Sequence, residues 1–385
     1  MIQREISVII VYATMNPIIT NLSEENGTLQ FTLSGVNVSL ANAIRRIALS
    51  EIPCVVIRTS PYIQSKMEIT SNTTRLNNEL IKQRMSCIPV YISDTSFPID
   101  NYELEIEKRN DGDIIEYVTT QDIKIRDLQS GKYLAESAVR EIFPPNEITG
   151  SYIDIARLRP KLSEEIDGEE LMLKSRLDIG TAKEDGAFNV VSTCSYGFTR
   201  DPIKVNDHLT EMEARLKDEG LDKDTIEFKK KDWLLLGADM LTIPDSFDFV
   251  IETVGQFTNM DIIHRASHVM LKKLNAFETA IKTNPELIQP SETTLDNGFD
   301  IKLHGEDYTL GKAIEYVLYS VHYGNSMNFC GFRKPHPHID ESIIRVGFKM
   351  QTPKEEVVNI LSNAISQLEK VYTQISDFFK EAVDE

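Results

Sequence analysis

Two segments far apart in the chain share one pattern of apolar and polar positions. Residues 31–57 and residues 300–320 each predict a short strand, a polar turn and a helix whose apolar side chains recur three or four positions apart. Ser39 and Thr309 occupy the positions where the N-caps of these two helices are expected. The shared plan predicts two related halves within one chain, each with an apolar helical face that needs a partner.

Each of these units is followed downstream by a longer amphipathic helix. The first is expected to run from Asn259, as its cap, to about Ile281, and the second follows a capping box that begins at Thr352 and has proline at the first helical position. Their apolar stripes predict that the two halves pair through these helices, and the alternative is that each stripe packs on the sheet of its own half. The residues predicted for the pairing are Ile263, Met270, Leu274, Phe277, Leu361, Ile365, Leu368, Tyr372, Ile375 and Phe379.

The patterns between and around these helices predict further elements. Residues 102–125 alternate apolar and charged side chains across an Asn-Asp-Gly turn, which predicts a β-hairpin. A charged stretch predicts a helix at about 207–217 that ends at Gly220, and the apolar run 6–13 indicates a strand rather than a signal peptide. The expected division is a larger half at 1–90 and 156–284, an inserted β-rich subdomain at 91–155, a linker at 285–299 and a smaller half at 300–385.

The composition is that of a soluble protein with an acidic balance. Of the 385 residues, 41% are hydrophobic and 26% are charged, which is ordinary for globular domains. The net charge of −19 predicts that the chain repels nucleic acid. Cys54, Cys87, Cys194 and Cys330 lie far apart, which indicates buried thiols in a reducing compartment. No apolar run approaches the ~20 residues of a membrane-spanning helix.

Several blocks resemble the alpha-like subunits of multisubunit DNA-directed RNA polymerases. ANAIRRIALSEIP (41–53), NNELIKQRMSCIPV (77–90) and FDFVIETVGQFTNMDII (247–263) are similar to the larger member of that pair, the lineage of bacterial alpha and its D-type counterpart in archaea. GEDYTLGKAI (305–314) and FCGFRKPHPHIDESIIRV (329–346) are similar to the smaller member, the L-type lineage of archaea. Cells usually make these as two polypeptides, so the chain resembles a fusion of both, an arrangement similar to that of large DNA viruses.

The resemblance implies a fold, a role and partners. The expected fold class is α+β, with two alpha-like dimerisation halves and an inserted, mostly β subdomain. The implied role is a non-catalytic assembly platform that docks the two largest subunits of the polymerase, together with a small subunit of the same complex. DNA would be reached only through the complex, and no membrane would be involved.

The resemblance also implies which residues meet other parts of the polymerase, and it places the helix of Arg45 and Arg46 against the second-largest subunit and the sister half. Arg45 and Arg46 are the leading candidates, because a guanidinium binds carboxylates through a planar fork of donors, and the plainer alternative is a solvated or locally paired couple. Tyr308 and Lys312 stand where the family commonly has His and Asn, so detailed contacts there are not carried over. The docking residues implied by position are Asn42, Arg45, Arg46, Glu51, Arg84, Glu306, Asp307, Thr309 and Gly311.

Signals for catalysis or metal binding are weak. The sequence has no GxSxG, P-loop or dinucleotide glycine pattern. His264 and His268 have the spacing of half a zinc site, but Arg265 stands where a metalloprotease has glutamate, so structural histidines are expected. His336 and His338 fall in a predicted loop. We therefore expect no enzyme activity of the chain's own, no metal and no cofactor.

Two other functions compete with this interpretation. A regulatory DNA-binding protein could use the same pairing fold, but it would need a basic patch that the acidic balance disfavours. An unrecognised hydrolase is the third alternative. If the fusion indicates a viral origin, the expected compartments are the virion and the host cytoplasm, or the nucleus.

Overall fold

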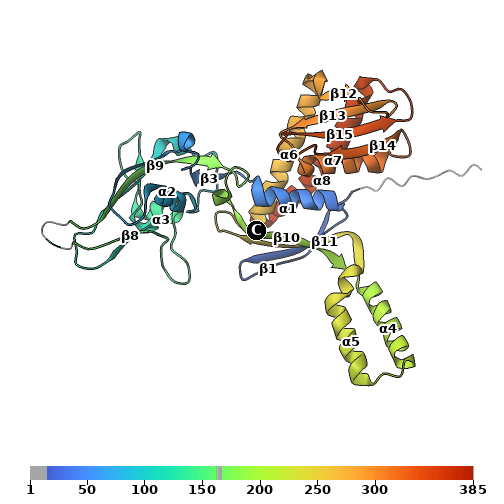
Figure 1. The fold of residues 1–385 in the computed structure, drawn as a ribbon, viewed down its shortest axis with the longest axis horizontal. Coiled ribbons are helices and arrows are strands. Elements are labelled where there is room, and N and C mark those ends of the chain that lie inside the picture. The colour runs from blue at the N-terminus through green and yellow to red at the C-terminus, as the bar shows by residue number, and fades with distance from the viewer. Residues whose placement is uncertain (1–14, 162, 164–166, 385) are drawn as a thin grey trace, which may run out of the picture. The chain divides into compact units, whose positions relative to one another are not determined.

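The fold was obtained as a computed structural model that describes residues 15–161, 163 and 167–384. The strand expected at 6–13 lies outside the described residues. Helices and sheets are mixed, which confirms the α+β class (Figure 1). The chain divides into two compact units, which we call the first and the second unit. The first consists of Met1–Ile47, Thr193–Ile251 and Ile263–Glu385, and the second of Ala48–Ser192 and Glu252–Ile262.

The first unit contains a four-stranded sheet in the order β1-β2-β11-β10, in which β1 and β2 pair antiparallel. Its strands are β1 (Ile18–Glu25), β2 (Thr28–Ser34), β10 (Val191–Arg200) and β11 (Thr242–Thr253). Figure 1 shows α1 (Val38–Ser50), α6 (Asn259–Thr283) and α8 (Lys354–Asp384) on the same side of this sheet.

The caps of α1 and α6 differ from the sequence prediction. The Asn37 side chain accepts a hydrogen bond from the backbone N of Ser39 (3.0 Å), so Asn37 rather than Ser39 caps α1. At α6, the hydroxyl of Thr258 accepts from the backbone N of Asp261 (3.1 Å), and Asn259 is already the first helical residue. In both helices the acceptor stands one or two residues earlier than expected.

The C-terminal part of the first unit is a second sheet covered by helices. The strands follow the order β12-β13-β15-β14 and are all antiparallel, and α7 (Tyr308–His322) packs on β14, β15 and α8. Asp307 caps α7 by accepting from the backbone N of Thr309 (2.9 Å), so the expected cap at Thr309 was wrong. The strands are β12 (Ile288–Pro290), β13 (Gly298–His304), β14 (Met327–Arg333) and β15 (Glu341–Phe348).

The segment expected as a linker, 285–299, contains regular structure. A 3-10 helix, η6 (Pro285–Leu287), leads directly into β12, and Ile288 pairs with Ile301 of β13. The irregular connection within it therefore shortens to 291–297, between the end of β12 and the start of β13. Pairing with β13 accounts for the difference, because a short strand of three residues leaves almost no periodic signal.

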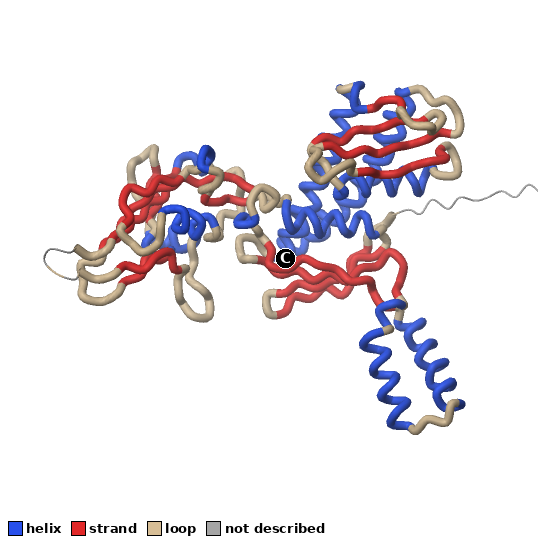
Figure 2. The backbone as a smooth tube through the Cα atoms, in the orientation of Figure 1, coloured by secondary structure: helices blue, strands red, loops and turns tan. Residues whose placement is uncertain are grey.

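A helical hairpin joins β10 to β11. It consists of α4 (Pro202–Asp218) and α5 (Lys223–Leu236), followed by η5 (Ala238–Met240), and Figure 2 shows the two helices antiparallel. The ring of His208 stacks on Trp233 at 4.1 Å between the helices. The helix expected at 207–217 is thus longer, while Gly220 lies just after its end with φ +77°. None of the helices in the described part is both long and apolar enough to span a bilayer.

The second unit is built around a sheet centred on β9. Its strand order is β3-β9-β5-β7, and β4 also pairs with β9, while β6 and β8 form a separate pair. Two helices, α2 (Asn78–Ser86) and α3 (Glu136–Ile142), contribute Ile81, Met85 and Val139 to its core. The strands are β3 (Cys54–Ile57), β4 (Met67–Asn72), β5 (Tyr102–Arg109), β6 (Glu116–Thr119), β7 (Lys124–Asp127), β8 (Asp154–Leu158) and β9 (Glu170–Gly180).

The hairpin predicted over 102–125 was wrong at its Asn-Asp-Gly turn, although the two ends of the segment pair antiparallel as β5 and β7. β5 pairs with β7 and β9, whereas β6 pairs with β8. Asn110 supplies the physical reason: it is fully buried, and its side-chain NH2 donates to the carbonyls of Ile114 (2.8 Å) and Leu158 (3.0 Å). These bonds tie the turn to the end of β8 instead of closing β5 against β6. The second unit, which contains these strands, extends well beyond the insertion predicted at 91–155.

Replacing Asn110 should destabilise the protein. Its Oδ1 also accepts from the backbone N of Gly112 (3.0 Å), so Asn110→Ala removes three hydrogen bonds to backbone groups, of which the one to Leu158 is buried. With about 1–3 kcal/mol for the unpaired buried carbonyl and about 0.5–1.5 kcal/mol for each of the other two hydrogen bonds, we expect the free energy of unfolding to fall by about 2–4 kcal/mol. Urea denaturation measures this. Asp113→Ala, in the exposed part of the same turn, is the control, and equal effects of the two changes would contradict the role of Asn110.

Candidate pairing interface and docking surfaces

The apolar seam of α8 covers the sheet formed by the front part of the chain. The ring of Phe379 packs edge-on against Phe31 of β2 at 5.0 Å, and Phe31 in turn stacks on Phe249 of β11 at 5.1 Å. Figure 1 shows how far apart these segments are in sequence, from blue β2 to red α8. The seam thus contacts strands outside its own half. All residues predicted for pairing are buried: Ile263, Met270, Leu274, Phe277, Leu361, Ile365, Leu368, Tyr372, Ile375 and Phe379.

Two polar contacts are buried along the same seam. Tyr372 is fully buried, and its hydroxyl donates to the carbonyl oxygen of Leu40 in α1 (3.3 Å). Burial raises the pKa of the Tyr372 phenol, so the hydroxyl stays protonated as the donor. In α6, Nδ1 of His264 lies 3.1 Å from the carbonyl oxygen and 3.0 Å from Oγ of Ser376 in α8. Polar groups at these depths fix the position of α8 along its neighbours.

An ion-pair cluster joins α1 to the turn before α7. Arg46 Nη2 lies 2.6 Å from Oδ2 of Asp307, and Arg46 Nε donates to Oγ1 of Thr309 at 2.8 Å. Lys273 of α6 lies 2.8 Å from Glu306. The sequence had assigned Arg46, Glu306, Asp307 and Thr309 to docking of a larger partner. Here these side chains make contacts inside the chain, and no sequence signal could pair Arg46 with a residue 261 positions away.

Arg45 differs from its neighbour Arg46. Its Nε donates to Oδ1 of Asn42 (2.9 Å), and within the described residues it forms no ion pair. It is half-buried near Cys194, whose pKa burial raises to about 12 while the positive charge of Arg45 opposes the rise. The N–H donors on both Nη nitrogens of Arg45 therefore remain for another carboxylate. Glu51, another of the predicted docking residues, is partly exposed.

The remaining predicted docking residues have clear local roles. Gly311 is buried in α7, and a Cβ placed there would lie 2.0 Å from Cε2 of Phe332, so glycine is required for the approach of β14. Arg84 is exposed on α2 of the second unit and donates to the backbone carbonyl of Asp154 (2.7 Å). Gly311 is thus explained by packing, while Arg84 presents its guanidinium at a surface.

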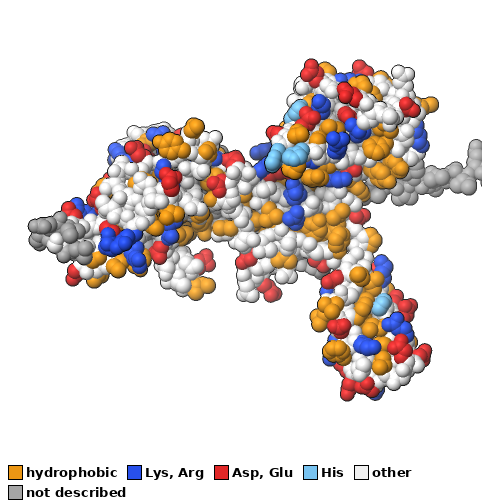
Figure 3. Space-filling view, in the orientation of Figure 1, with side chains coloured by type: hydrophobic (Ala, Val, Ile, Leu, Met, Phe, Trp, Pro, Cys, Tyr) orange, Lys and Arg blue, Asp and Glu red, His pale blue; other side chains and the backbone are white. Residues whose placement is uncertain are grey.

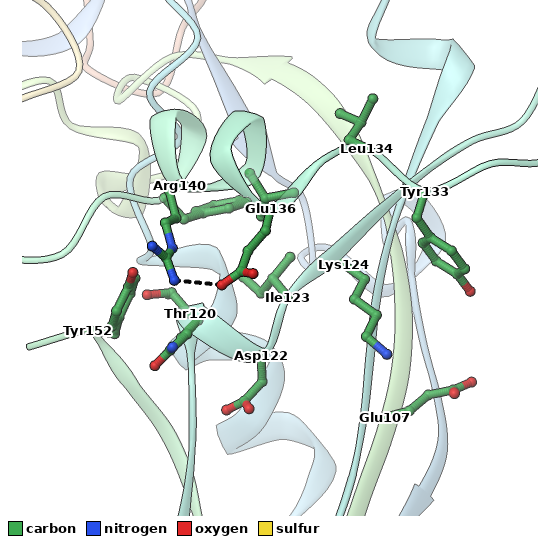
Figure 4. A pocket seen from close by; sticks show the side chains of 13 residues that line it. Glu107, Thr120, Asp122, Ile123, Lys124, Tyr133, Leu134, Glu136, Arg140 and Tyr152 are labelled. Atoms are coloured by element: carbon green, nitrogen blue, oxygen red, sulfur yellow. Dashed lines mark hydrogen bonds and ion pairs between the residues drawn. The ribbon is translucent and has the colours of Figure 1, made fainter.

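A cavity in the second unit, shown in Figure 4, was a further candidate site. Its volume is about 530 Å³, and it lies beside α3 and η3 (Thr120–Asp122). Three of its charged groups make local contacts: Glu136 and Arg140 form an ion pair at 2.5 Å, and Asp122 accepts from Lys108 (2.9 Å). The described residues that line it include no serine, cysteine or histidine. It therefore offers no nucleophile paired with a histidine base.

The histidine candidates are held by local contacts. His268 has its pKa lowered by burial, with the neighbouring Lys272 and His264 adding to the effect, so it is neutral near pH 7. In the loop after β14, the backbone N of His338 donates to Nδ1 of His336 (3.1 Å). Within the described ranges, no group of three or more His, Cys, Asp or Glu side chains is placed to hold a metal ion.

Strand–helix units that pair through long helices define a dimerisation fold, and this chain contains two of them. The chain belongs to the RNA polymerase Rpb3/Rpb11 dimerisation domain family: one model of that family matches residues 30–274 and a second matches residues 299–377. Both matches in one polypeptide confirm the resemblance to a fused pair of alpha-like subunits.

Several relatives are named as subunits of DNA-directed RNA polymerases. The DNA-directed RNA polymerases I and III subunit rpac1 of Dictyostelium discoideum is 23% identical over 68% of this chain and 80% of its own length. The DNA-directed RNA polymerase subunit Rpo3 of Pyrococcus horikoshii is 24% identical over 66% of this chain and 94% of its own. A protein of Acanthamoeba polyphaga mimivirus, named as a DNA-directed RNA polymerase subunit, is 31% identical over 35% of each chain. These relatives support a subunit of DNA-directed RNA polymerase.

The Arg46–Asp307 ion pair should couple the two parts of the chain measurably. Both side chains are about one-third exposed, so a double-mutant cycle of Arg46→Ala and Asp307→Ala should give a coupling of about 0.5–1 kcal/mol in urea unfolding. The surface pair Glu278 and Lys282, one turn apart on α6, is the matched control, with about 0.3–0.5 kcal/mol expected. A coupling of zero for Arg46 and Asp307 beside a normal control would show that the pair does not hold the parts together.

Proposed function

We propose that this chain is a non-catalytic assembly platform of a DNA-directed RNA polymerase, an intramolecular heterodimer that docks the two largest subunits and a small subunit of the same complex. The observation that carries the proposal is the contact of α8 with Phe31 and Leu40. The C-terminal helix fills the pairing position on the front part, so pairing needs no second chain. The family match and the names of the relatives support the polymerase context.

A structural rather than catalytic role fits the use of the chain's charged groups. Arg46, Asp307 and Lys273 act in contacts between segments, and the charged groups around the cavity of Figure 4 hold α3 and η3. The catalytic chemistry of the complex would then be supplied by the docked subunits. The relative from a mimivirus supports a viral context, and virion and host cytoplasm are the compartments we propose.

Docking of a large partner would use groups that the chain itself leaves available. Arg45 is the leading candidate, because its guanidinium makes one hydrogen bond to Asn42 and no ion pair among the described residues. A partner carboxylate could accept two parallel hydrogen bonds from it. DNA would be reached through the complex, since a net charge of −19 opposes direct binding to phosphates.

Cutting the chain between its parts tests the pairing. A protease site inserted after Thr293 lies in an exposed segment between β12 and β13, so it leaves both strands intact. We expect the cleaved fragments to co-elute in size-exclusion chromatography and to separate only in denaturant, because the buried seam rather than the connection holds them. The uncut protein is the control. Fragments that elute apart while each keeps its folded circular-dichroism spectrum would disprove the platform.

Changing Arg45 tests the docking. We expect Arg45→Ala to weaken binding of the two largest polymerase subunits about tenfold or more, equivalent to about 1.4 kcal/mol, because a fork of donors to a carboxylate is lost. Co-purification and titration of the reconstituted complex measure this. Arg140→Ala, which breaks an exposed pair within α3, is the control. Full binding by the Arg45 variant would remove Arg45 from the docking surface, and failure of the wild-type chain to bind would reject the proposed function.

A further inference from the structure

A basic pocket stands out on the second unit of this acidic protein. Its volume is about 640 Å³, and four arginines line it: Arg75, Arg84, Arg157 and Arg159. We call it the arginine pocket. In the space-filling view of Figure 3, basic side chains gather over β8, with hydrophobic side chains beside them. Because the chain carries a net charge of −19, such a local excess of positive charge needs a reason.

Strand alternation places two of the arginines on the same outward face. In β8, Ala156 and Leu158 are buried, while Arg157 between them is exposed, and Arg159 is exposed just beyond the strand. Successive side chains of a strand point to opposite faces, so residues 157 and 159 share one face. Arg157 stands directly opposite Tyr117 of β6 in the strand pairing. The pocket is therefore built on a paired ribbon, not on a free loop.

Two of the arginines are fixed by contacts, and two are not. Arg159 Nε and Nη2 both lie 2.6 Å from Oε1 of Glu169, a buried carboxylate, and Arg84 is bonded to the backbone of Asp154. Arg75 and Arg157 form no ion pair within the described part of the chain. The pocket thus holds a fixed pair of guanidiniums with two further charges left for a ligand.

Apolar side chains complete the surface. Ile115 and Tyr117 line the pocket and are each 48% exposed, although both are large enough to be costly to leave in water. The Asp154 side chain is the one carboxylate that lines the pocket, and the described structure pairs it with no cation. Guanidiniums beside an exposed aromatic ring and an aliphatic side chain suit a ligand that carries carboxylates and apolar groups together.

We propose that the arginine pocket binds a short acidic segment of a polymerase partner subunit, with carboxylates on Arg75 and Arg157 and an apolar side chain on Ile115 and Tyr117. This inference rests on the proposed function, because it names the kind of segment that this unit receives. A peptide is favoured over nucleic acid for an electrostatic reason. A polyanion of many phosphates is repelled by the whole chain at long range, whereas a short segment meets only the local charge.

The experiment measures peptide binding to the full chain without other subunits. The probe is a fluorescein-labelled twelve-residue peptide in which glutamates alternate with leucine and phenylalanine, followed by fluorescence anisotropy. We expect saturable binding that weakens at least tenfold in the Arg75→Ala/Arg157→Ala variant. It should also weaken several-fold in Ile115→Ser/Tyr117→Ser, which tests the apolar part. Because all four side chains are exposed, the melting temperatures of the variants should match the wild type.

Matched probes separate the alternatives. Arg126→Ala/Arg140→Ala removes two arginines that already have carboxylate partners elsewhere in the unit, and it should leave peptide binding unchanged. Equal weakening by this control, or unchanged binding by the Arg75→Ala/Arg157→Ala variant, would overturn the proposal. Tighter, Arg157-dependent binding of a twenty-nucleotide single-stranded DNA would also overturn it, in favour of a nucleic-acid site.

The outcome is independent of the docking test at Arg45. Assembly with the two largest subunits is measured separately, so a failure of assembly beside arginine-dependent peptide binding would reject the proposed function and keep the pocket. Normal assembly without peptide binding would reject the pocket and keep the function.

Discussion

The fold of the first unit depends on the burial of the α8 seam. Phe379 and Tyr372 are fully buried against residues of β2 and α1, more than 300 positions earlier in the chain. Burying a large apolar side chain contributes about 1.5–3 kcal/mol, and a heptad seam repeats that contribution along the helix. Because both sides of the contact belong to one polypeptide, the entropy cost of bringing them together is reduced, and the ratio of the two halves is fixed.

Apolar burial alone does not choose a register, so the polar contacts add information that the seam lacks. The Tyr372 hydroxyl, the His264–Ser376 contact and the Arg46–Asp307–Thr309 cluster each require a particular alignment of two segments. Misaligned pairing would leave a buried phenol and a half-buried guanidinium without partners, at a cost larger than the gain from making the bonds. Arg46, Asp307 and Thr309, which the sequence analysis assigned to docking, thus help to align segments within the chain.

The sequence predicted the elements whose signal is local and failed where the partner is remote. The seams of α6 and α8 were found because helical spacing repeats within one segment, and the burial of all their predicted residues follows from that spacing. The caps were displaced, since Asn37 and Asp307 stand two positions before Ser39 and Thr309 and both members of each couple are capable acceptors. The turn of the hairpin over 102–125 failed because β6 finds its partner in β8, outside the predicted segment, while β5 pairs with β7 and β9. For the same reason, the sequence pointed to Arg46 as a candidate interface residue but could not show that its partner is Asp307.

Each unit pairs one of these arginines internally and leaves others without an ion pair among the described residues, and this division bears on how a platform could select its partners. In the first unit, Arg46 forms an internal ion pair, whereas Arg45 on the same helix is bonded only to Asn42 within the part of the chain that the structure describes. In the second unit, Arg159 is neutralised by buried Glu169, but Arg75 and Arg157 are not. A strongly acidic protein gains nothing in solubility from unpaired arginines beside exposed Ile115 and Tyr117. Under the proposed function, the internally paired arginines stabilise the chain and the others recognise partner subunits, so that stability and partner choice are set by separate sets of residues.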